Sequence, residues 1–335
     1  MLFDPITDGA QVAQTRALSP APPALAQSTL YADALGAVGA QILTLPLEEE
    51  VGRATLILRQ MPVIGRVALL PGGPWWATPD LGPPHKQAAL RPLFAQAHAM
   101  GIRALISNPA DHADGQVLRR LGGLPLLTPQ TEARLDLSPP DDARRKQLHG
   151  KWRNRLTRGE AAGLTITEDS FAPKRHLWIL ELEAAQRKSH GYRALPLDVL
   201  MAAAAQAPHQ VRVFTARRRG RALAAMVFLL HEGAATYHIA VQRPEARTTG
   251  AHNLLLWQAS CALKQAGIQR LDLGPVETER DTGLARFKLG TGAALHQRGP
   301  TLLHCRATAP LGRLAAWVSR TGARAAEARN DPSCR

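Results

Sequence analysis

The stretch LDLGP at residues 271–275, followed after a short polar loop by GLARFKLGTG at residues 283–292, decides the fold of the second half of the chain. Its alternating apolar residues predict a strand that ends at a Gly-Pro break. A loop is then expected to present Arg286 and Lys288 on either side of Phe287, before a Gly-x-Gly turn closes the unit. Two cations at a strand end favour an anionic ligand or a developing oxyanion over simple packing.

Size and composition indicate a globular protein of two domains. The 335 residues exceed what one small domain needs, and the hydrophobic content is 45%. The longest apolar run, residues 223–230, is well short of the roughly 18 residues of a membrane-spanning helix. The start of the chain has no basic leader, and three cysteines lie far apart. We therefore expect a cytoplasmic protein with no signal peptide, disulfide framework or metal site.

The net charge of +14 is concentrated in one half of the chain. Residues 1–140 hold 10 Lys and Arg against 11 Asp and Glu, whereas residues 141–335 hold 31 against 16. Such asymmetry predicts a polyanionic partner for the second half, such as nucleic acid, a phosphorylated carrier or an anionic membrane face. The alternative is an arginine-rich surface that follows codon usage and has no such partner.

A Pro-rich segment at residues 138–142 is the best linker candidate. It divides the chain into an N-terminal domain (1–140) and a C-terminal catalytic domain (141–305), and a basic tail (306–335) follows. The tail is either an RNA- or membrane-binding segment or a plain terminal helix that packs on the N-terminal domain.

The second half shows the clearer pattern of strands and helices. Residues 211–216, 222–230 and 234–241 alternate like consecutive antiparallel strands. An apolar helix over 253–265 and a strand over 268–273 follow. This order predicts an α/β (α+β) architecture, in which a mixed, largely antiparallel sheet is flanked by helices. The first half follows a similar plan of strands and helices.

Cations gather on two predicted helices. In the basic helix of residues 142–162, Lys151, Arg155 and Arg158 follow an i, i+4, i+7 spacing and share one face. This face predicts phosphate binding, and the alternative is a solvated surface. Arg187 stands near the end of another helix, where it either complements the helix dipole or faces a ligand.

A third candidate region joins a strand to the start of a helix. Tyr237 and His238 lie on the predicted strand, and His238 is either a general base or a structural residue. The turn at residues 247–253 contains Gly and opens a helix, which favours an anion site bounded by Arg247 and Asn253. The sequence has no convincing catalytic triad, and no CxxC, HExxH or GxxxxGK motif.

Taken together, these segments resemble the GNAT acyltransferase superfamily. More narrowly, they resemble the Fem-type (FemABX-like) transferases and the CelD-like acetyltransferases. In the second half the similar stretches are a basic helix, a helix entry and a closing D-x-G … G-L-x-x-F-K signature, at 151–164, 250–257 and 267–288. In the first half they are a Gln-Ser opening at 26–32 and a Gly-Gly-Pro turn at 70–75.

The resemblance implies tandem GNAT-like domains and transfer of an acyl or aminoacyl group to an amine. For Fem-type enzymes it implies aminoacyl-tRNA as donor, a peptidoglycan precursor as anionic acceptor, no metal or other cofactor, and work at the inner face of the membrane. It also implies that Lys288 stabilises charge during transfer. Arg286 is added as a catalytic candidate on local geometry. The candidate substrate-binding residues are Lys151, Arg155, Arg187, Tyr237, His238, Arg247 and Asn253.

One departure bears on the donor. The acetyl-CoA fingerprint Q/R-x-x-G-x-G/A is met only in part by residues 247–252, because His252 stands in the last place. This departure favours aminoacyl-tRNA over coenzyme A. Two alternatives stay open: an acyl-CoA-dependent N-acyltransferase on the same fold, and a non-catalytic RNA- or envelope-binding protein.

Overall fold

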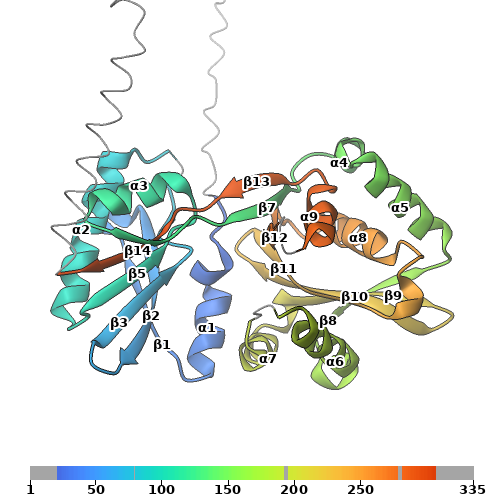
Figure 1. Cartoon of the computed structure of the whole chain (residues 1–335), viewed down its shortest axis with the longest axis horizontal. Coiled ribbons are helices and arrows are strands. Elements are labelled where there is room, and N and C mark those ends of the chain that lie inside the picture. Colours follow the sequence, from blue (N-terminus) through green and yellow to red (C-terminus); the bar gives the residue numbers. More distant parts are fainter. Residues whose placement is uncertain (1–20, 79, 192–194, 278–280, 307–335) are drawn as a thin grey trace, which may run out of the picture.

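The chain forms two lobes that lie side by side, as the computed structural model shows (Figure 1). The structure describes residues 21–78, 80–191, 195–277 and 281–306. Most of the predicted basic tail, residues 307–335, therefore lies outside the described residues.

The first lobe is a mixed sheet with helices packed on it. Its strands are β1 (Gln41–Pro46), β2 (Gly52–Met61), β3 (Gly65–Pro71), β4 (Trp75–Trp76), β5 (Ala104–Asn108), β6 (Leu124–Leu127) and β14 (Thr301–Cys305). Its helices are η1 (Leu25–Gln27), α1 (Thr29–Ala37), η2 (Glu48–Glu50), α2 (Pro83–Ala99) and α3 (His112–Arg120). The strand order is β1-β2-β3-β5-β14-β6, and β4 pairs with β2.

The second lobe is also built on a seven-stranded mixed sheet, with helices on both faces (Figure 1). Its strands are β7 (Thr131–Asp136), β8 (Thr165–Ser170), β9 (Val211–Arg218), β10 (Arg221–His231), β11 (Ala234–Gln242), β12 (Arg270–Pro275) and β13 (Ala294–Gln297). Its helices are α4 (Asp141–Gln147), α5 (Gly150–Ala161), α6 (Pro173–His190), α7 (Leu197–Gln206), η3 (Pro208–Gln210), η4 (Pro244–Ala246), α8 (Ala251–Gln265) and α9 (Thr282–Leu289). The strand order is β13-β7-β12-β11-β10-β9-β8.

The predicted fold class is confirmed. Strands β9, β10 and β11 form the expected antiparallel meander. Helix α8 then returns the chain so that β12 pairs with β11 in parallel. The sheet is therefore mixed, with one parallel pair inserted among antiparallel ones.

The two lobes exchange one strand each. Strand β7, from the first 140 residues, pairs with β12 and β13 in the second sheet. Strand β14, from the other side of the proposed boundary, inserts between β5 and β6 of the first sheet. The chain thus crosses between the lobes twice, before β7 and after β13, and these two strands pair with each other.

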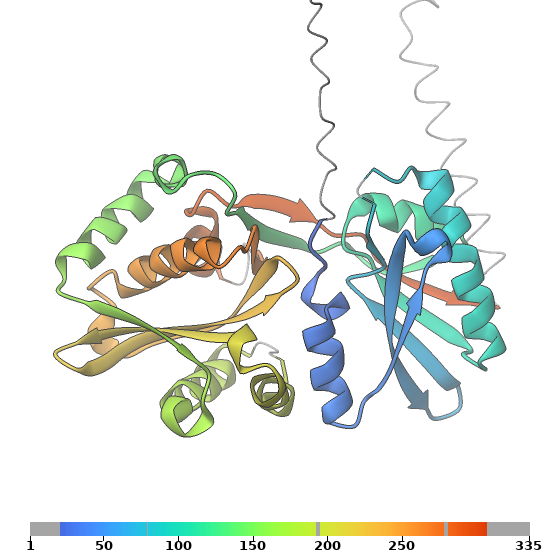
Figure 2. The same ribbon diagram turned by 180° about the vertical axis from the view of Figure 1, so that it is seen from behind.

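A hydrophobic core joins the lobes below these crossings. Helix α1 of the first lobe packs against α7 of the second (Figure 2). Leu30, Ala34 and Leu35 from α1 share one buried cluster with Leu200 and Ala203 from α7. This contact removes apolar surface from water on both lobes, which holds them together.

Helices α5 and α8 cross through a contact between two glycines. A Cβ added at Gly159 would lie 2.8 Å from the Gly250 carbonyl oxygen. A Cβ added at Gly250 would collide with the carbonyl oxygen of Arg155. Gly250 also has a positive φ of 77° and precedes the first turn of α8. The start of α8 therefore lies directly against the backbone of α5.

Replacing Gly250 with alanine should destabilise the protein more than a matched change at Gly267. Gly267 has a similar φ of 84°, but an added Cβ there meets nothing within 4 Å. Gly267→Ala should cost about 1–2 kcal/mol for its left-handed conformation alone. Gly250→Ala should cost about 1–3 kcal/mol more because of the collision. Urea unfolding of both variants measures the difference, and equal losses would contradict the close packing.

Candidate active site

Lys288 is positioned by a helix, although the sequence predicted a loop. Asp281 caps α9, since its Oδ1 accepts a hydrogen bond from the Leu284 N–H at 2.8 Å. Trp152 of α5 holds the other end, because its Nε1 donates to the Phe287 carbonyl at 3.0 Å. The loop prediction was wrong because one Asp cap starts the helix, which Gly283 in its first turn does not prevent.

The Lys288 side chain turns inward to the end of β12. The residue is only 5% exposed, and its Nζ donates to the Pro275 carbonyl at 2.7 Å. Gly274 has a φ of 79°, and a Cβ there would lie 3.7 Å from Nζ. An ammonium group has three N–H donors. One is used by Pro275, and no other partner lies within hydrogen-bond distance among the described residues.

Burial lowers the pKa of Lys288 to about 8, although the carboxylates of Asp281 and Glu132 oppose the shift. The ordinary pKa of a lysine is about 10.4. Because the pKa stays above 7, the side chain carries its positive charge at neutral pH. A buried ammonium with free donors can stabilise a negative charge that develops on a bound carbonyl oxygen.

Arg286 differs from Lys288 in its surroundings. It lies on the same helix but is exposed to solvent. Two residues along an α-helix place side chains on nearly opposite faces. The structure thus separates the two predicted catalytic cations, and only Lys288 faces the interior.

The predicted substrate-binding cations lie on the surface of the second lobe. Lys151 and Arg155 are exposed on α5, and Arg247 is exposed just before α8. The contact between Arg155 and Gly250 places the α5 cations beside the start of α8. Arg187 lies apart from them near the end of α6, with its Nη2 3.8 Å from Glu183 Oε2.

Tyr237 and His238 lie at an irregularity of the sheet. The register between β10 and β11 shifts here, so that Tyr237 pairs with Phe228 while His238 has no counterpart. The Tyr237 ring packs 5.9 Å from the Phe228 ring. Burial lowers the pKa of His238 to about 4. A histidine that is neutral at pH 7 and so weakly basic fits a structural role better than general-base catalysis.

The start of α8 is occupied by protein groups. Pairing between β11 and β12 ends at Thr236 and Asp272, while β11 continues to Gln242. His252 lies next to this open stretch, and its Nε2 is 3.1 Å from the Val241 carbonyl oxygen. Asn253, 4% exposed, has a buried Nδ2 without a hydrogen-bond partner in the described residues.

A row of alternating charges, which the sequence interpretation missed, lies between the lobes. We call it the charge row; in order, its members are Arg270, Asp272, Arg134, Glu132 and Arg298. The end pairs are close, with nitrogen–oxygen distances of 2.9 Å, and the two central contacts are 3.6 Å. The members are largely buried, with side-chain exposure between 14% and 19%.

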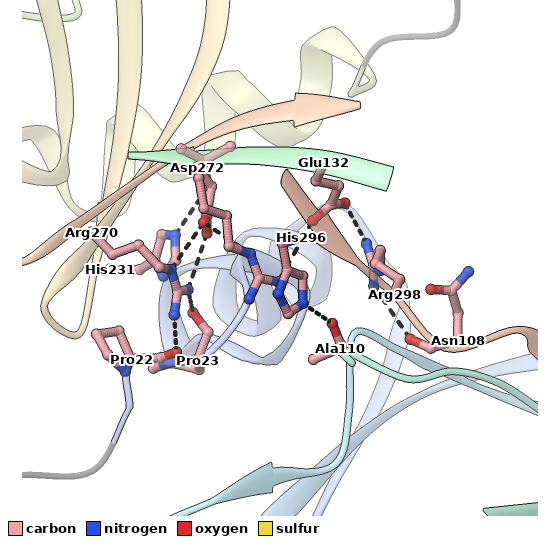
Figure 3. Close-up of polar contacts among 12 residues, drawn as sticks. Pro22, Pro23, Asn108, Ala110, Glu132, His231, Arg270, Asp272, His296 and Arg298 are labelled. Atoms are coloured by element: carbon pink, nitrogen blue, oxygen red, sulfur yellow. Dashed lines mark hydrogen bonds and ion pairs between the residues drawn. The ribbon is translucent and has the colours of Figure 1, made fainter. Parts of the chain in front are cut away.

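Both ends of the charge row attach to the first lobe (Figure 3). Arg270 donates to the carbonyls of Pro22 and Pro23 at 2.7 and 2.8 Å. At the other end Arg298 donates to the Asn108 carbonyl at 3.3 Å. A sequence signal existed, because opposite charges stand two residues apart on both β7 and β12. That spacing puts them on one face of each strand.

Comparison with known proteins identifies the fold. Residues 142–298 match the model of the acetyltransferase (GNAT) domain family. The chain is similar to the crystal structure of FemX, with a TM-score of 0.73 at 12% identity, covering 89% of this chain and 96% of FemX. None of the curated proteins matches the sequence.

Two further solved structures share the fold. One is the C-terminal domain of a protein described as a lysylphosphatidylglycerol synthetase from Agrobacterium fabrum, with a TM-score of 0.52 at 16% identity, covering 87% of this chain and 92% of that one. The other is L-PGS from Bacillus licheniformis, with a TM-score of 0.55 at 14% identity, covering 86% and 88%.

Membrane and metal features were also sought in the described part of the chain. None of its helices combines the length and apolar character required to cross a bilayer. Among the same residues, no three His, Cys, Asp or Glu side chains are grouped to hold a metal ion.

The buried charge of Lys288 should leave a signature in the pH dependence of stability. Its pKa is lowered in the folded state, so the unfolded chain binds more protons between about pH 8 and 10.4, and stability rises with pH there. Lys288→Met removes the buried charge. The stability of this variant relative to wild type should therefore be greatest near pH 7 and decline above pH 8.

Thermal unfolding from pH 7 to 10 measures this decline. Arg286→Met is the control, because it removes an exposed cation of the same helix and should show no such trend. A constant difference between Lys288→Met and wild type over this range would contradict the lowered pKa.

Proposed function

We propose that this chain, whose residues 142–298 match the GNAT acetyltransferase domain, transfers an aminoacyl group from aminoacyl-tRNA to an amine of an anionic, cell-envelope-type acceptor. The observation that carries the proposal is the buried, charged Lys288 at the end of β12. Similarity to FemX and to a protein named as a lysylphosphatidylglycerol synthetase supports aminoacyl transfer and an anionic acceptor.

In the proposed reaction, the neutral amine of the acceptor attacks the carbonyl carbon of the aminoacyl ester. The carbonyl oxygen becomes an oxyanion, to which Lys288 donates one of its two remaining N–H groups. When the tetrahedral intermediate collapses, the carbon–oxygen bond to the ribose breaks and the amide is formed. The proton lost by the amine ends on the ribose oxygen, so atoms and charges balance.

The neighbourhood of α8 favours aminoacyl-tRNA over coenzyme A. Phosphates bind helix N-termini where small residues let them approach the backbone. Here Gly250 packs against the backbone of α5, and the His252 side chain lies beside the part of β11 that does not pair with β12, with its Nε2 next to the Val241 carbonyl. The start of the helix is thus crowded by groups of the protein itself.

The exposed face of α5 offers a different phosphate site. Lys151, Arg155 and Arg158 are all exposed and form no ion pair with a described carboxylate. Arg247 lies beside them, since α5 contacts the turn that precedes α8. Such a face suits the backbone of a nucleic acid, whose binding releases counterions and weakens as salt is added.

Replacing Lys288 tests the chemical step. Lys288→Gln should fold normally yet lose transfer by about 10²-fold or more, as expected when one oxyanion donor is removed. Wild-type activity should also fall as pH rises through about 8, because the charged form is then lost. The assay follows the mass increment on candidate amines supplied with charged tRNA.

Arg286→Gln is the matched control for that experiment. We expect its rate of transfer to change by about threefold at most, because substitutions of exposed residues usually have small effects. If Lys288→Gln kept full activity, Lys288 would have no catalytic role. If Arg286→Gln lost as much as Lys288→Gln, the sequence-based assignment of both cations would stand instead.

The donor is tested by binding. Wild-type protein should bind charged tRNA with an affinity that falls steeply with salt, and a triple Lys151→Gln, Arg155→Gln, Arg158→Gln variant should show a weaker salt dependence. A ligand that binds the folded state raises the melting temperature. Since we expect coenzyme A not to bind, it should leave the melting temperature unchanged. A clear shift with coenzyme A, together with acyl transfer from acyl-CoA, would replace the tRNA proposal by an acyl-CoA one.

A further inference from the structure

The hairpin between β2 and β3 ends in exposed apolar residues. We call the end of this hairpin, the last residue of β2 and its turn (Met61, Pro62, Val63 and Ile64), the hairpin tip. Val63 is 102% exposed, Ile64 50% and Met61 44%. The structure puts residues 62–64 in the turn. The surfaces of soluble proteins rarely carry such contiguous apolar side chains unless these contact a partner or a membrane.

The conformation of Val63 makes the hairpin tip more unusual. Its φ is 68°, in the left-handed region that favours glycine. A β-branched side chain is especially unfavourable there. Glycine would satisfy the turn at lower cost, and the valine contacts no core. The folded protein alone therefore gives no reason for an apolar side chain at this position.

More apolar groups lie at the same end of the first lobe. Gln41, the first residue of β1, pairs with Leu58 near the end of β2, and Ala104, the first residue of β5, pairs with Val67 near the start of β3. The loops that precede β1 and β5 therefore lie beside the hairpin tip. Each carries an exposed apolar residue, Val38 at 37% and Met100 at 38%.

The charges at this end have one sign. Arg59, Arg66 and Arg103 flank the hairpin tip, and the segments 38–42, 58–67 and 97–104 contain no Asp or Glu. Arg66 donates to two neutral oxygens, those of the Met100 backbone and the Gln41 side chain, both at 3.5 Å. The Arg103 side chain lies along Gly65, because a Cβ added at this glycine would be 3.3 Å from the Arg103 Cδ. No described carboxylate forms an ion pair with these arginines.

We propose that this end of the first lobe docks on an anionic lipid bilayer. The hairpin tip inserts its apolar side chains at the boundary between headgroups and acyl chains, and the three arginines contact lipid phosphates. Apolar groups surrounded by cations match the layered chemistry of that surface. The proposal does not depend on the identity of the aminoacyl donor or acceptor.

The shape of the site favours lipid over a second copy of the chain. Each partner in a stable protein interface buries roughly 800 Å², mostly on a broad complementary surface. A convex turn of four residues offers much less area. A bilayer, in contrast, deforms around an inserted tip, so all of its apolar atoms leave water.

Vesicle co-sedimentation tests the proposal. The full chain should bind vesicles of phosphatidylglycerol and phosphatidylcholine, and binding should weaken at high salt and without phosphatidylglycerol. Val63→Gly combined with Ile64→Ser should reduce binding about tenfold or more, given the apolar area removed. This variant keeps the hairpin foldable, because glycine relieves the strain at residue 63, and it leaves the basic tail intact.

Leu126→Ser combined with Leu127→Ser is the matched control, since these leucines, 47% and 66% exposed, both belong to β6 and lie outside the hairpin. It should bind vesicles like wild type. Arg59→Gln should reduce binding about fivefold, as expected for one cation near an anionic surface. Equal vesicle binding by the hairpin variant and wild type would overturn the proposal. So would a dimer by light scattering that the hairpin variant abolishes.

Discussion

The contact between Arg270 and its four acceptors is the constraint on which the arrangement of the lobes depends. Its guanidinium donates to both carboxylate oxygens of Asp272 and to the carbonyls of Pro22 and Pro23. A planar guanidinium can serve all four acceptors at once, which a lysine cannot. Because these groups are mostly buried, leaving any of them unpaired would be costly. This contact therefore fixes where β12 meets the start of the described chain.

Much of the second lobe could be predicted from the sequence, because its signals are local. The meander, α8 and β12 follow from the alternation and the apolar periodicity of their residues. The position of Lys288 near the end of β12 followed from its spacing after the Gly-Pro break. Helix α9 was missed, since the cap at Asp281 was not weighed against the glycine that follows two residues later.

The features that could not be predicted all depend on contacts between distant segments. Nothing local indicates that β7 leaves the first lobe for the second sheet, or that β14 returns. The charge row exists only after those crossings, because it joins β7, β12 and the residue after β13. The exposure of the hairpin tip could not be predicted either, because the exposure of an apolar residue is decided by what packs over it in the fold.

The crossings also connect the proposed active site to the first lobe. Glu132 contributes to the field at Lys288 and accepts a hydrogen bond from Arg298 at 2.9 Å. Arg298 in turn donates to Asn108 at the end of β5. A change in the distance between the lobes would therefore alter the pairing of Glu132, and with it the charge that Lys288 experiences. The first lobe contains none of the predicted catalytic cations, yet through Arg298 and Glu132 it contributes to the charge around the proposed site.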